Sequence, residues 1–343
     1  MRAIFDGHND ALTRDDHALL VAGRPGGDLD LPRMQRGGVR GAIFAVFSEQ
    51  GEHGRDRLVP RDDGVIEFEY APPVDHAYAA ADGAAAAGRL LALERAGDVT
   101  LGRRAADLDA ARSADGPPVA VLHLEGADAI DAELESLDLW YAAGLRSLGP
   151  VWSRANAFGF GVPFISPSTP DTGPGLTAAG RALITRCSEL GILVDVSHLN
   201  EAGFWDVARL DRGPIVASHA AAHALCPGSR NLTDRQLDAI GASGGLVGIV
   251  FACPFLRPDF ADDPDTPIEL IANHARYVAD RIGVEHVALG SDFDGATIPR
   301  AVGDVAGMPK VLDALAGAGF TDPELDAISW GNWRRVLGAW WRD

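Results

Sequence analysis

Short runs of β-branched and other apolar residues recur along this chain of 343 residues, and stretches with a helical spacing of apolar residues separate them. This alternation predicts parallel strands joined by crossover helices, because neighbouring parallel strands need a long return connection. Eight such units predict a closed (β/α)8 barrel, the TIM barrel, rather than an open sheet. The predicted strands are residues 3–5, 41–47, 119–124, 144–148, 192–196, 214–217, 246–251 and 286–289.

The segments between these runs agree with crossover helices. Residues 178–190 and 234–242 space their apolar side chains as one face of a helix does. The alanine-rich run 77–93 favours a helix over a linker, because alanine has the highest helix propensity. Barrels of this type commonly reach this length undivided. We therefore expect a single domain over residues 1–343.

Two stretches interrupt the alternation. Residues 48–73 are polar and charged, whereas residues 158–175 are rich in glycine and proline, which forbids a regular helix. Both stretches follow predicted strands. Because the loops after the strands form the active face of such barrels, we expect active-face insertions at these two places, as lids or pocket walls.

The formal net charge of −19 argues against binding to nucleic acid or to an anionic membrane surface, because both would repel the whole molecule. No apolar run has the length of a membrane span, and the first residues lack the apolar core of a secretory signal. We therefore expect a cytoplasmic protein whose partners are small molecules or other proteins. The widely separated Cys187, Cys226 and Cys253 form no metal or redox motif and are expected to be reduced and packed.

The chain has a single lysine, Lys310, which lies outside every predicted strand. A carbamylated lysine that bridges two metal ions and a Schiff-base lysine are therefore both excluded. The sequence also lacks the glycine-rich motifs that bind nucleotide phosphates and the Gly-x-Ser-x-Gly turn of serine hydrolases. Any chemistry must come from other side chains.

Residue types that bind metals stand at the ends of several predicted strands. His8 and Asp10 follow the first strand two residues apart, and side chains at i and i+2 of an extended segment point to the same side. Glu125 ends the third strand, and Ser-His pairs place His198 and His219 after the fifth and sixth. Because the carboxyl ends of barrel strands meet at one rim, we expect these donors to converge.

Nitrogen and oxygen donors without thiolates suit zinc, with manganese, cobalt or iron as less favoured occupants. The set is large enough for two ions, with Glu125 as the bridge between them. His8 and Asp10 would complete the first ion. His198 and His219 would complete the second. A shared water, whose pKa falls towards about 7 between two ions, would then be the nucleophile.

Further candidate residues belong to the same rim. Asp292, after the eighth strand, is expected to act as general base and acid, and Asp294 to cap the turn or support the site. Arg230 would bind a substrate carboxylate, because a guanidinium binds carboxylate bidentately and the chain is otherwise acidic. His123 shares a strand face with Glu125 and is expected behind the ligands. The histidines in polar or surface-like contexts are His17, His53, His76, His274 and His286.

These residues resemble the membrane dipeptidases, also called renal dipeptidases, of the amidohydrolase superfamily, over nearly the whole chain. The motifs that carry the resemblance are Asp6-Gly7-His8-Asn9-Asp10, Leu124-Glu125-Gly126, Gly175-Leu176-Thr177 to Asp195-Val196-Ser197-His198, Ala217-Ser218-His219, Ser229-Arg230-Asn231-Leu232 and Gly290-Ser291-Asp292-Phe293-Asp294-Gly295. The resemblance implies a two-zinc (β/α)8 barrel of the amidohydrolase type and a homodimer. It implies the same ligand set, a catalytic role for Asp292 and a substrate-carboxylate role for Arg230.

Two positions depart from the family pattern. Better-known members carry a histidine after the fourth strand that contacts the substrate and the tetrahedral intermediate, whereas this chain has Trp152 there. An indole donates one hydrogen bond but cannot become cationic, so oxyanion stabilisation would rest on the metals, on Trp152 or on nearby Arg154. Ala252 stands where a tyrosine is often found after the seventh strand.

The sequence therefore predicts a binuclear zinc dipeptidase that cleaves dipeptides, L-Xaa-D-Xaa among them, with a metal-bridging hydroxide. Two alternatives stay open. One is another metal-dependent hydrolase, such as an N-acyl-amino-acid amidase or a lactonase. The other is a binding protein that retains the metals without catalysis.

Overall fold

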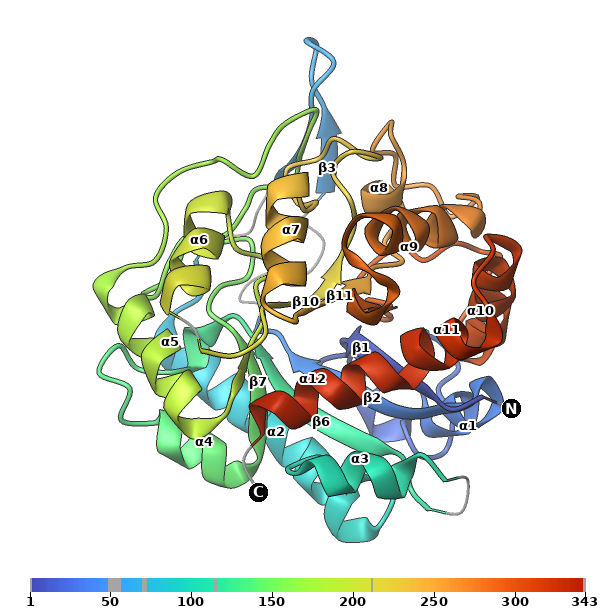
Figure 1. The fold of residues 1–343 in the computed structure, drawn as a ribbon. Coiled ribbons are helices and arrows are strands. Elements are labelled where there is room, and N and C mark those ends of the chain that lie inside the picture. The colour runs from blue at the N-terminus through green and yellow to red at the C-terminus, as the bar shows by residue number, and fades with distance from the viewer. Residues whose placement is uncertain (1, 49–56, 70–72, 114–115, 211, 342–343) are drawn as a thin grey trace.

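The computed structural model describes residues 2–48, 57–69, 73–113, 116–210 and 212–341. Two parallel sheets, surrounded by helices, form the centre of this described part (Figure 1). The first sheet runs β1–β2–β6–β7–β9 and the second β10–β11–β12. The strands are β1 (Ile4–Asn9), β2 (Val39–Val46), β6 (Val119–Glu125), β7 (Leu145–Gly149), β9 (Leu193–Val194), β10 (Val216–Ala220), β11 (Leu246–Ile249) and β12 (Val287–Leu289).

Each of these strands overlaps one of the runs predicted from the sequence, so the parallel α/β architecture is confirmed. Backbone hydrogen bonds also join the two sheets at both of their outer strands. Beyond β9, the Val196 N–H donates to the Val216 carbonyl over 2.9 Å. Beyond β1, the Asp10 N–H donates to the Phe293 carbonyl over 2.9 Å.

Helices connect the strands, and local capping explains several of their ends. The predicted helices 178–190 and 234–242 form with those bounds, and Thr177 caps the first by accepting the Gly180 N–H. The helices are α1 (Leu31–Gly37), α2 (His76–Ala96), α3 (Ala105–Ala111), α4 (Leu137–Ala143), α5 (Ala178–Leu190), α6 (Glu201–Leu210), α7 (Asp234–Ala242), α8 (Cys253–Leu256), α9 (Glu269–Ile282), α10 (Met308–Gly317), α11 (Asp322–Asp326) and α12 (Asn332–Trp340).

The two interrupting stretches contain strands that the sequence did not indicate. The first holds the antiparallel pair β3 (Arg57–Pro60) and β4 (Ile66–Glu69), and β3 projects from the body of the fold in Figure 1. The second holds β8 (Ile165–Ser166), which pairs with β4. The stretches are therefore joined to each other by a small antiparallel sheet. Residues 49–56 and 70–72 of the first stretch lie outside the described residues.

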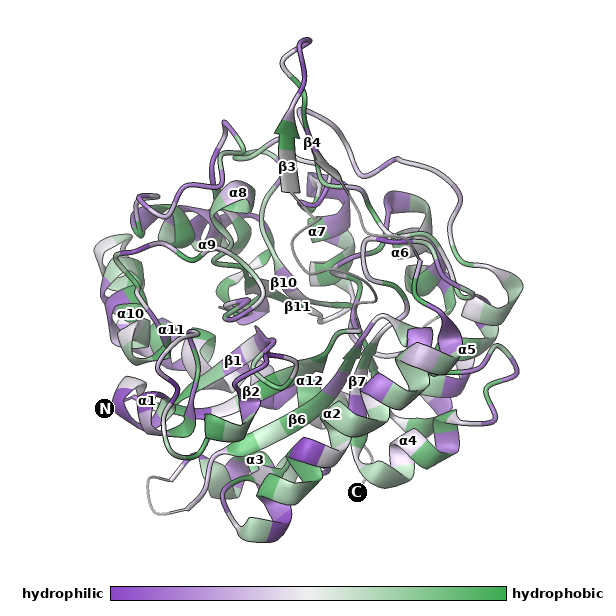
Figure 2. Ribbon diagram, turned by 180° about the vertical axis from the view of Figure 1, so that it is seen from behind, coloured by the Kyte–Doolittle hydropathy of each residue, from purple (hydrophilic) through white to green (hydrophobic). Residues whose placement is uncertain are grey.

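The core follows the parallel strands. Every residue of β6 is buried, and Figure 2 shows this strand as largely hydrophobic. Between β1 and the last helices, Phe5 packs edge-on against Trp330 with ring centroids 5.8 Å apart. The three cysteines are buried and none of them forms a disulfide in the described part of the chain, in agreement with the prediction that they are reduced and packed. In the described ranges, none of the helices combines the length and apolarity that crossing a lipid bilayer requires. A short strand, β5 (Thr100–Leu101), pairs with β6 and was not predicted.

The surface-like context predicted for His274 and His286 is wrong, because both are buried. His274 lies on α9, and the residues that it contacts, Ala222 and Leu256, are distant from it in the sequence. Its Nδ1 accepts the Ala222 N–H over 3.0 Å and its Nε2–H donates to the Leu256 carbonyl over 3.1 Å. Burial lowers the pKa of His274 to about 4, so the ring is neutral at pH 7. The neutral imidazole ties the segment after β10 to the end of α8.

We expect His274→Ala to lower the free energy of unfolding by about 2 kcal/mol, because two buried backbone groups lose their partner. The wild-type chain should also lose stability as the pH falls from about 6.5 towards 4, since the unfolded chain takes up the proton first. Urea denaturation of both proteins at pH 7 and pH 5 measures this. An equal loss of stability on acidification in the two proteins would contradict the role of His274.

Candidate metal centre

The metal-binding residues predicted from the sequence converge on Glu125. Its Oε1 atom lies 2.9 Å from His198 Nε2, 3.4 Å from His8 Nε2 and 3.5 Å from His219 Nε2. These side chains come from the ends of β6, β9, β1 and β10, which meet at one rim. The Nε2 atoms of His198 and His219 are 2.9 Å apart, so both rings point at the same place.

Two overlapping groups of donors have the spacing that a metal ion requires. In each group, the donor atoms lie within 4.8 Å of one another. The first group is His8, Asp10 and Glu125, and the second is Glu125, His198 and His219. Because Glu125 belongs to both, the geometry suits two neighbouring ions that share one carboxylate.

The chemistry of these side chains fits a divalent metal. His8 is fully buried, and neither of its ring nitrogens has a hydrogen-bond partner in the described part of the chain. A buried polar atom without a partner is costly, and metal ligation would remove that cost. The outer nitrogens of His198 and His219 contact the hydroxyls of Ser153 at 2.9 Å and Ser218 at 2.8 Å. Such outer contacts orient ligating histidines.

The electrostatics of His198, His219 and Glu125 favour the protonation states that ligate metals. Burial lowers the pKa of His198 to about 4, and the neighbouring Arg230 charge acts in the same direction. Burial likewise holds the pKa of His219 well below its usual value. Burial opposes ionisation of Glu125, but the His8 charge and hydrogen bonds outweigh it, so the pKa of Glu125 lies well below its usual range. Neutral imidazoles and an ionised carboxylate are the ligating forms, and His198, His219 and Glu125 have them. His8 differs, because burial opposes its protonation but the carboxylates of Glu125 and Asp10 outweigh the effect of burial and hold the pKa of His8 well above its usual value.

Asp292 lies beside the first group, and one of its oxygens is within 4.8 Å of donor atoms of His8 and His219. Its backbone has φ 65°, a left-handed conformation, and its N–H donates to the His8 carbonyl over 3.1 Å. Burial, together with the charges of Asp10 and Glu125, raises the pKa of Asp292 to about 7. This carboxyl group is therefore able to hold and release a proton near neutral pH.

Asp294 belongs to neither donor group. Its carboxylate accepts hydrogen bonds from Arg24 and from the Asp28 N–H, the latter over 2.8 Å. Asp294 thus anchors the loop before α1 to the end of β12, in agreement with a supporting role.

The three residues predicted to bind substrate lie at different depths. Arg230 is buried, its Nη2 donates to the His219 carbonyl over 2.9 Å, and the same atom is 3.3 Å from His198 Nε2. The half-buried Trp152 ring lies 5.8 Å from the His198 ring. The Arg154 guanidinium lies 5.0 Å from the Trp152 ring, on the side of Ser48, to whose carbonyl it donates. Arg230 and Trp152 therefore border His198, whereas the buried Arg154 contacts the Trp152 ring.

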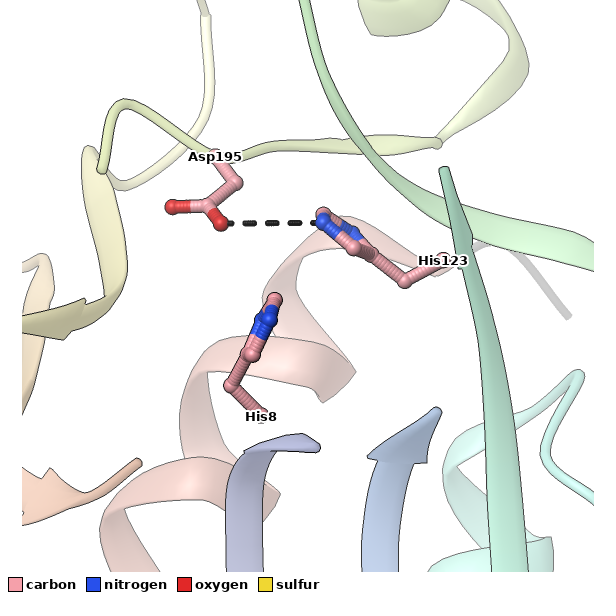
Figure 3. Close-up of side chains that lie close together, drawn as sticks. All are labelled: His8, His123 and Asp195. Carbon is pink, nitrogen blue, oxygen red and sulfur yellow. Dashed lines mark ion pairs between the residues drawn. The ribbon is translucent and has the colours of Figure 1, made fainter. Parts of the chain in front are cut away.

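Of the residues behind the histidines, the sequence indicated His123 but not Asp195. Figure 3 shows His8 of β1, His123 of β6 and Asp195 directed towards one another. His123 Nε2 is 3.8 Å from Asp195 Oδ2, and its Nδ1 is 2.8 Å from Ser147 Oγ. His123 thus lies behind the ligands, as expected. Asp195 could have been found from the sequence, because it lies in the apolar run of residues 192–196 and a charged side chain buried there needs partners.

Comparison with known proteins shows one consistent set of relatives. The profile of the family described as membrane dipeptidase (peptidase family M19) matches residues 2–340. A crystal structure of a metallopeptidase from Rhodobacter sphaeroides, liganded with a phosphinate mimic of the dipeptide L-Ala-D-Ala, is 43% identical, covers 99% of each chain and has a TM-score of 0.93.

Curated sequences agree with this match. An uncharacterised protein encoded in the pqqA 5' region of Klebsiella pneumoniae is 49% identical over 72% of this chain and 91% of that protein. Dipeptidase aclJ of Aspergillus oryzae is 32% identical over 64% of this chain and 50% of that protein.

We expect zinc to stabilise the metal-free protein, because the folded state gathers ligands that the unfolded chain does not. The gain should be about 2.7 kcal/mol per site at a free zinc concentration 100 times Kd. Glu125→Gln should lose most of this gain, since it removes the charge that both donor groups share. Glu94→Gln, which breaks an ion pair with Arg103 far from the centre, is the control and should keep it. Thermal unfolding with and without zinc measures the effect; an undiminished gain in Glu125→Gln would contradict the site.

Proposed function

The chain belongs to the membrane dipeptidase family and is a metallo-dipeptidase, and on this premise we propose that two zinc ions around Glu125 serve its reaction. His8 and Asp10 would hold one ion. His198 and His219 would hold the other, and Glu125 would contact both. The observation that supports this most strongly is the position of Glu125 Oε1, within 3.5 Å of the Nε2 atoms of three histidines.

Zinc ions at such a centre lower the pKa of water and polarise the carbonyl group of the substrate. We propose that Asp292 carries the proton of the reaction. Its carboxylate would accept a proton from the attacking water and then donate it to the amine nitrogen as the C–N bond breaks. In the metal-free chain, burial and the neighbouring carboxylates raise the pKa of Asp292 to about 7, so this carboxyl group takes up a proton more readily than an exposed aspartate does.

Arg230 would bind the C-terminal carboxylate of the dipeptide. Its guanidinium is buried beside His198, and a charged pair in this position would be protected from water. Trp152, with Arg154 behind it, would form the wall of the pocket next to His198. The phosphinate mimic of L-Ala-D-Ala bound by the Rhodobacter sphaeroides relative supports dipeptides with a D residue at the C-terminal side as substrates.

For the fold, we propose that the two parallel sheets form one closed (β/α)8 barrel in a single domain, with active-face insertions at residues 48–73 and 158–175. The hydrogen bonds that join the sheets beyond β9 and β1 support closure. The homodimer and the cytoplasmic location stay predictions from the sequence and the family resemblance.

A screen of dipeptides tests this function directly. The zinc-loaded protein is assayed with L,L- and L,D-dipeptides and, in parallel, with N-acetylated amino acids and lactones. Release of free amino acids from dipeptides is the expected result. Cleavage of the acetylated or lactone substrates alone would favour another metal-dependent hydrolase, and binding without turnover would favour a binding protein. These alternative substrates are included because Trp152, which replaces the family histidine, cannot become cationic.

Asp292→Asn should lower kcat at least about 100-fold while leaving the metal content intact, because the amide cannot take up and return a proton. Asp294→Asn is the neighbouring control, and we expect it to cost stability rather than kcat. Steady-state kinetics and elemental analysis of both variants measure this. Turnover retained in Asp292→Asn would remove its assigned role.

Arg230→Gln should raise KM for dipeptides about 10- to 100-fold, the value of a charge-assisted hydrogen bond of about 1.5–3 kcal/mol. Dipeptide amides, which lack the terminal carboxylate, provide the matched substrates and should lose much less. If dipeptides and their amides lose the same factor, Arg230 does not recognise the carboxylate.

A further inference from the structure

We propose that Asp195 is a positioning residue that acts through the hydroxyl of Ser218 to hold His219 in one tautomer. In this tautomer the proton is on Nδ1, and the lone pair of Nε2 faces Glu125 and His198. The inference rests on the proposed metal-binding role of His219, but the tautomer itself belongs to the metal-free protein. Asp195 and Ser218 are distant in sequence from Glu125, and neither was among the predicted site residues.

The first step concerns the Oδ1 atom of Asp195. It accepts the backbone N–H groups of Ser197 over 3.0 Å and of Ser218 over 2.9 Å, as well as the Ser197 hydroxyl over 2.6 Å. Backbone N–H groups can only donate, so whatever occupies the Oδ1 position must be an acceptor. The orientation of the Asp195 side chain is therefore fixed by two neighbouring strand ends.

The second step concerns the Oδ2 atom, which contacts the Ser218 hydroxyl. Burial raises the pKa of Asp195, but His123 and the hydrogen bonds from Ser197 and Ser218 lower it below its usual value, so the carboxylate is ionised. An ionised carboxylate only accepts, and Ser218 must therefore donate its single hydroxyl proton to Oδ2. The contact from Ser218 Oγ to Ser197 Oγ is longer, at 3.4 Å.

The third step follows from that donation. Ser218 Oγ is 2.8 Å from His219 Nδ1, and with its proton directed at Asp195 it can only accept there. His219 therefore carries its proton on Nδ1, which leaves Nε2 as a lone pair. That atom is the one that lies 3.5 Å from Glu125 Oε1. The hydrogen bonds from His219 to Ser218 and from Ser218 to Asp195 thus run in one direction, and this direction determines which nitrogen of His219 faces the centre.

The backbone of Ser218 is held rigidly enough for this purpose. A Cβ atom at Gly248 or at Gly290 would lie 1.9 Å from the Ser218 carbonyl oxygen, and one at Gly7 would lie 2.8 Å from it. Three different strands, or their ends, therefore use glycine so that the Ser218 backbone can pack against them. Side chains at these positions would displace the hydroxyl that links Asp195 to His219.

The same residues do not make a third metal site with His8 and His123. Both oxygens of Asp195 are already occupied by hydrogen-bond donors. The dashed line in Figure 3 marks the ion pair between His123 and Asp195. Its two atoms, His123 Nε2 and Asp195 Oδ2, are 3.8 Å apart, which is beyond hydrogen-bond distance. The hydrogen bonds of Asp195 hold its carboxylate in one orientation, as a positioning residue requires.

Asp195→Asn gives the sharpest test because the amide must bind in one orientation. Its oxygen must take the Oδ1 position, facing the two N–H donors, and its NH2 group must take the Oδ2 position. The NH2 group then donates to Ser218, and the freed Ser218 proton donates to His219 Nδ1. Asp195→Asn should therefore switch His219 to the tautomer with the proton on Nε2, directed at the metals.

The tautomer is read by nitrogen NMR of the metal-free protein labelled in its ten histidines, with His219 assigned from its missing signals in His219→Ala. Wild type is expected with the proton on Nδ1 and Asp195→Asn with the proton on Nε2. Zinc affinity, measured by competition with a chelator, should fall about 10- to 100-fold at one of the two ions. An unchanged tautomer in Asp195→Asn, or a proton on Nε2 in wild type, would overturn the proposal.

Two further variants keep the test decisive if Asp195→Asn folds poorly. Ser218→Ala removes the link and should lower zinc affinity, whereas Ser218→Thr keeps the hydroxyl and should restore it. In a Ser218→Ala background, Asp195→Asn should cause little additional loss, since Asp195 acts through Ser218. Additive losses would overturn the link.

Asp6→Asn is the matched control for a buried carboxylate. Asp6 accepts the N–H and hydroxyl of Ser291, and among the described residues no histidine ring nitrogen forms a hydrogen bond with it, so its amide should leave the His219 tautomer unchanged. A tautomer switch in this control would contradict a specific role for Asp195. Failure of the proposed metal function would instead appear as zinc affinity that is unchanged in His219→Ala.

Discussion

The buried carboxylate of Glu125 at the end of β6 is the group on which the rest of the site depends. An ionised carboxylate removed from water needs compensation from charges or hydrogen bonds, and here three imidazoles approach a single oxygen. Those imidazoles come from strands that are far apart in sequence, so only the pairing of parallel strands brings their ends to one rim. The donor set therefore depends on the fold, because a register error in β1 or β10 would move the histidines away from Glu125.

A second set of contacts holds the donors in a ligating state. Ser153 and Ser218 contact the outer nitrogens of His198 and His219, and the buried guanidinium of Arg230 acts with burial to keep His198 neutral. The same guanidinium is a local positive charge in a chain with a formal net charge of −19, which is what a carboxylate-bearing substrate needs. His198 is thus the residue at which the contacts that orient a ligand lie next to the charge that would attract substrate. The Trp152 ring lies beside it.

The sequence was sufficient for the parallel strands and for the residues that converge on Glu125, because short apolar runs and His or acidic residues at their ends are local signals. It was insufficient for the pairing of β4 with β8, which joins two stretches about 100 residues apart and has no local signal. The surface-like context assigned to His274 failed for the same reason, since its burial depends on α8 and on the segment after β10. Asp195 was not predicted because its hydrogen bonds with Ser197 and Ser218 form only when two strand ends lie side by side in the fold.

The most direct measurement of the central claim is X-ray diffraction from crystals of the zinc-loaded protein, recorded on both sides of the zinc absorption edge. Two anomalous peaks, one beside His8 and Asp10, the other beside His198 and His219, with Glu125 between them, are the predicted result. A single peak, or peaks that do not contact Glu125, would contradict a two-metal centre built around this carboxylate.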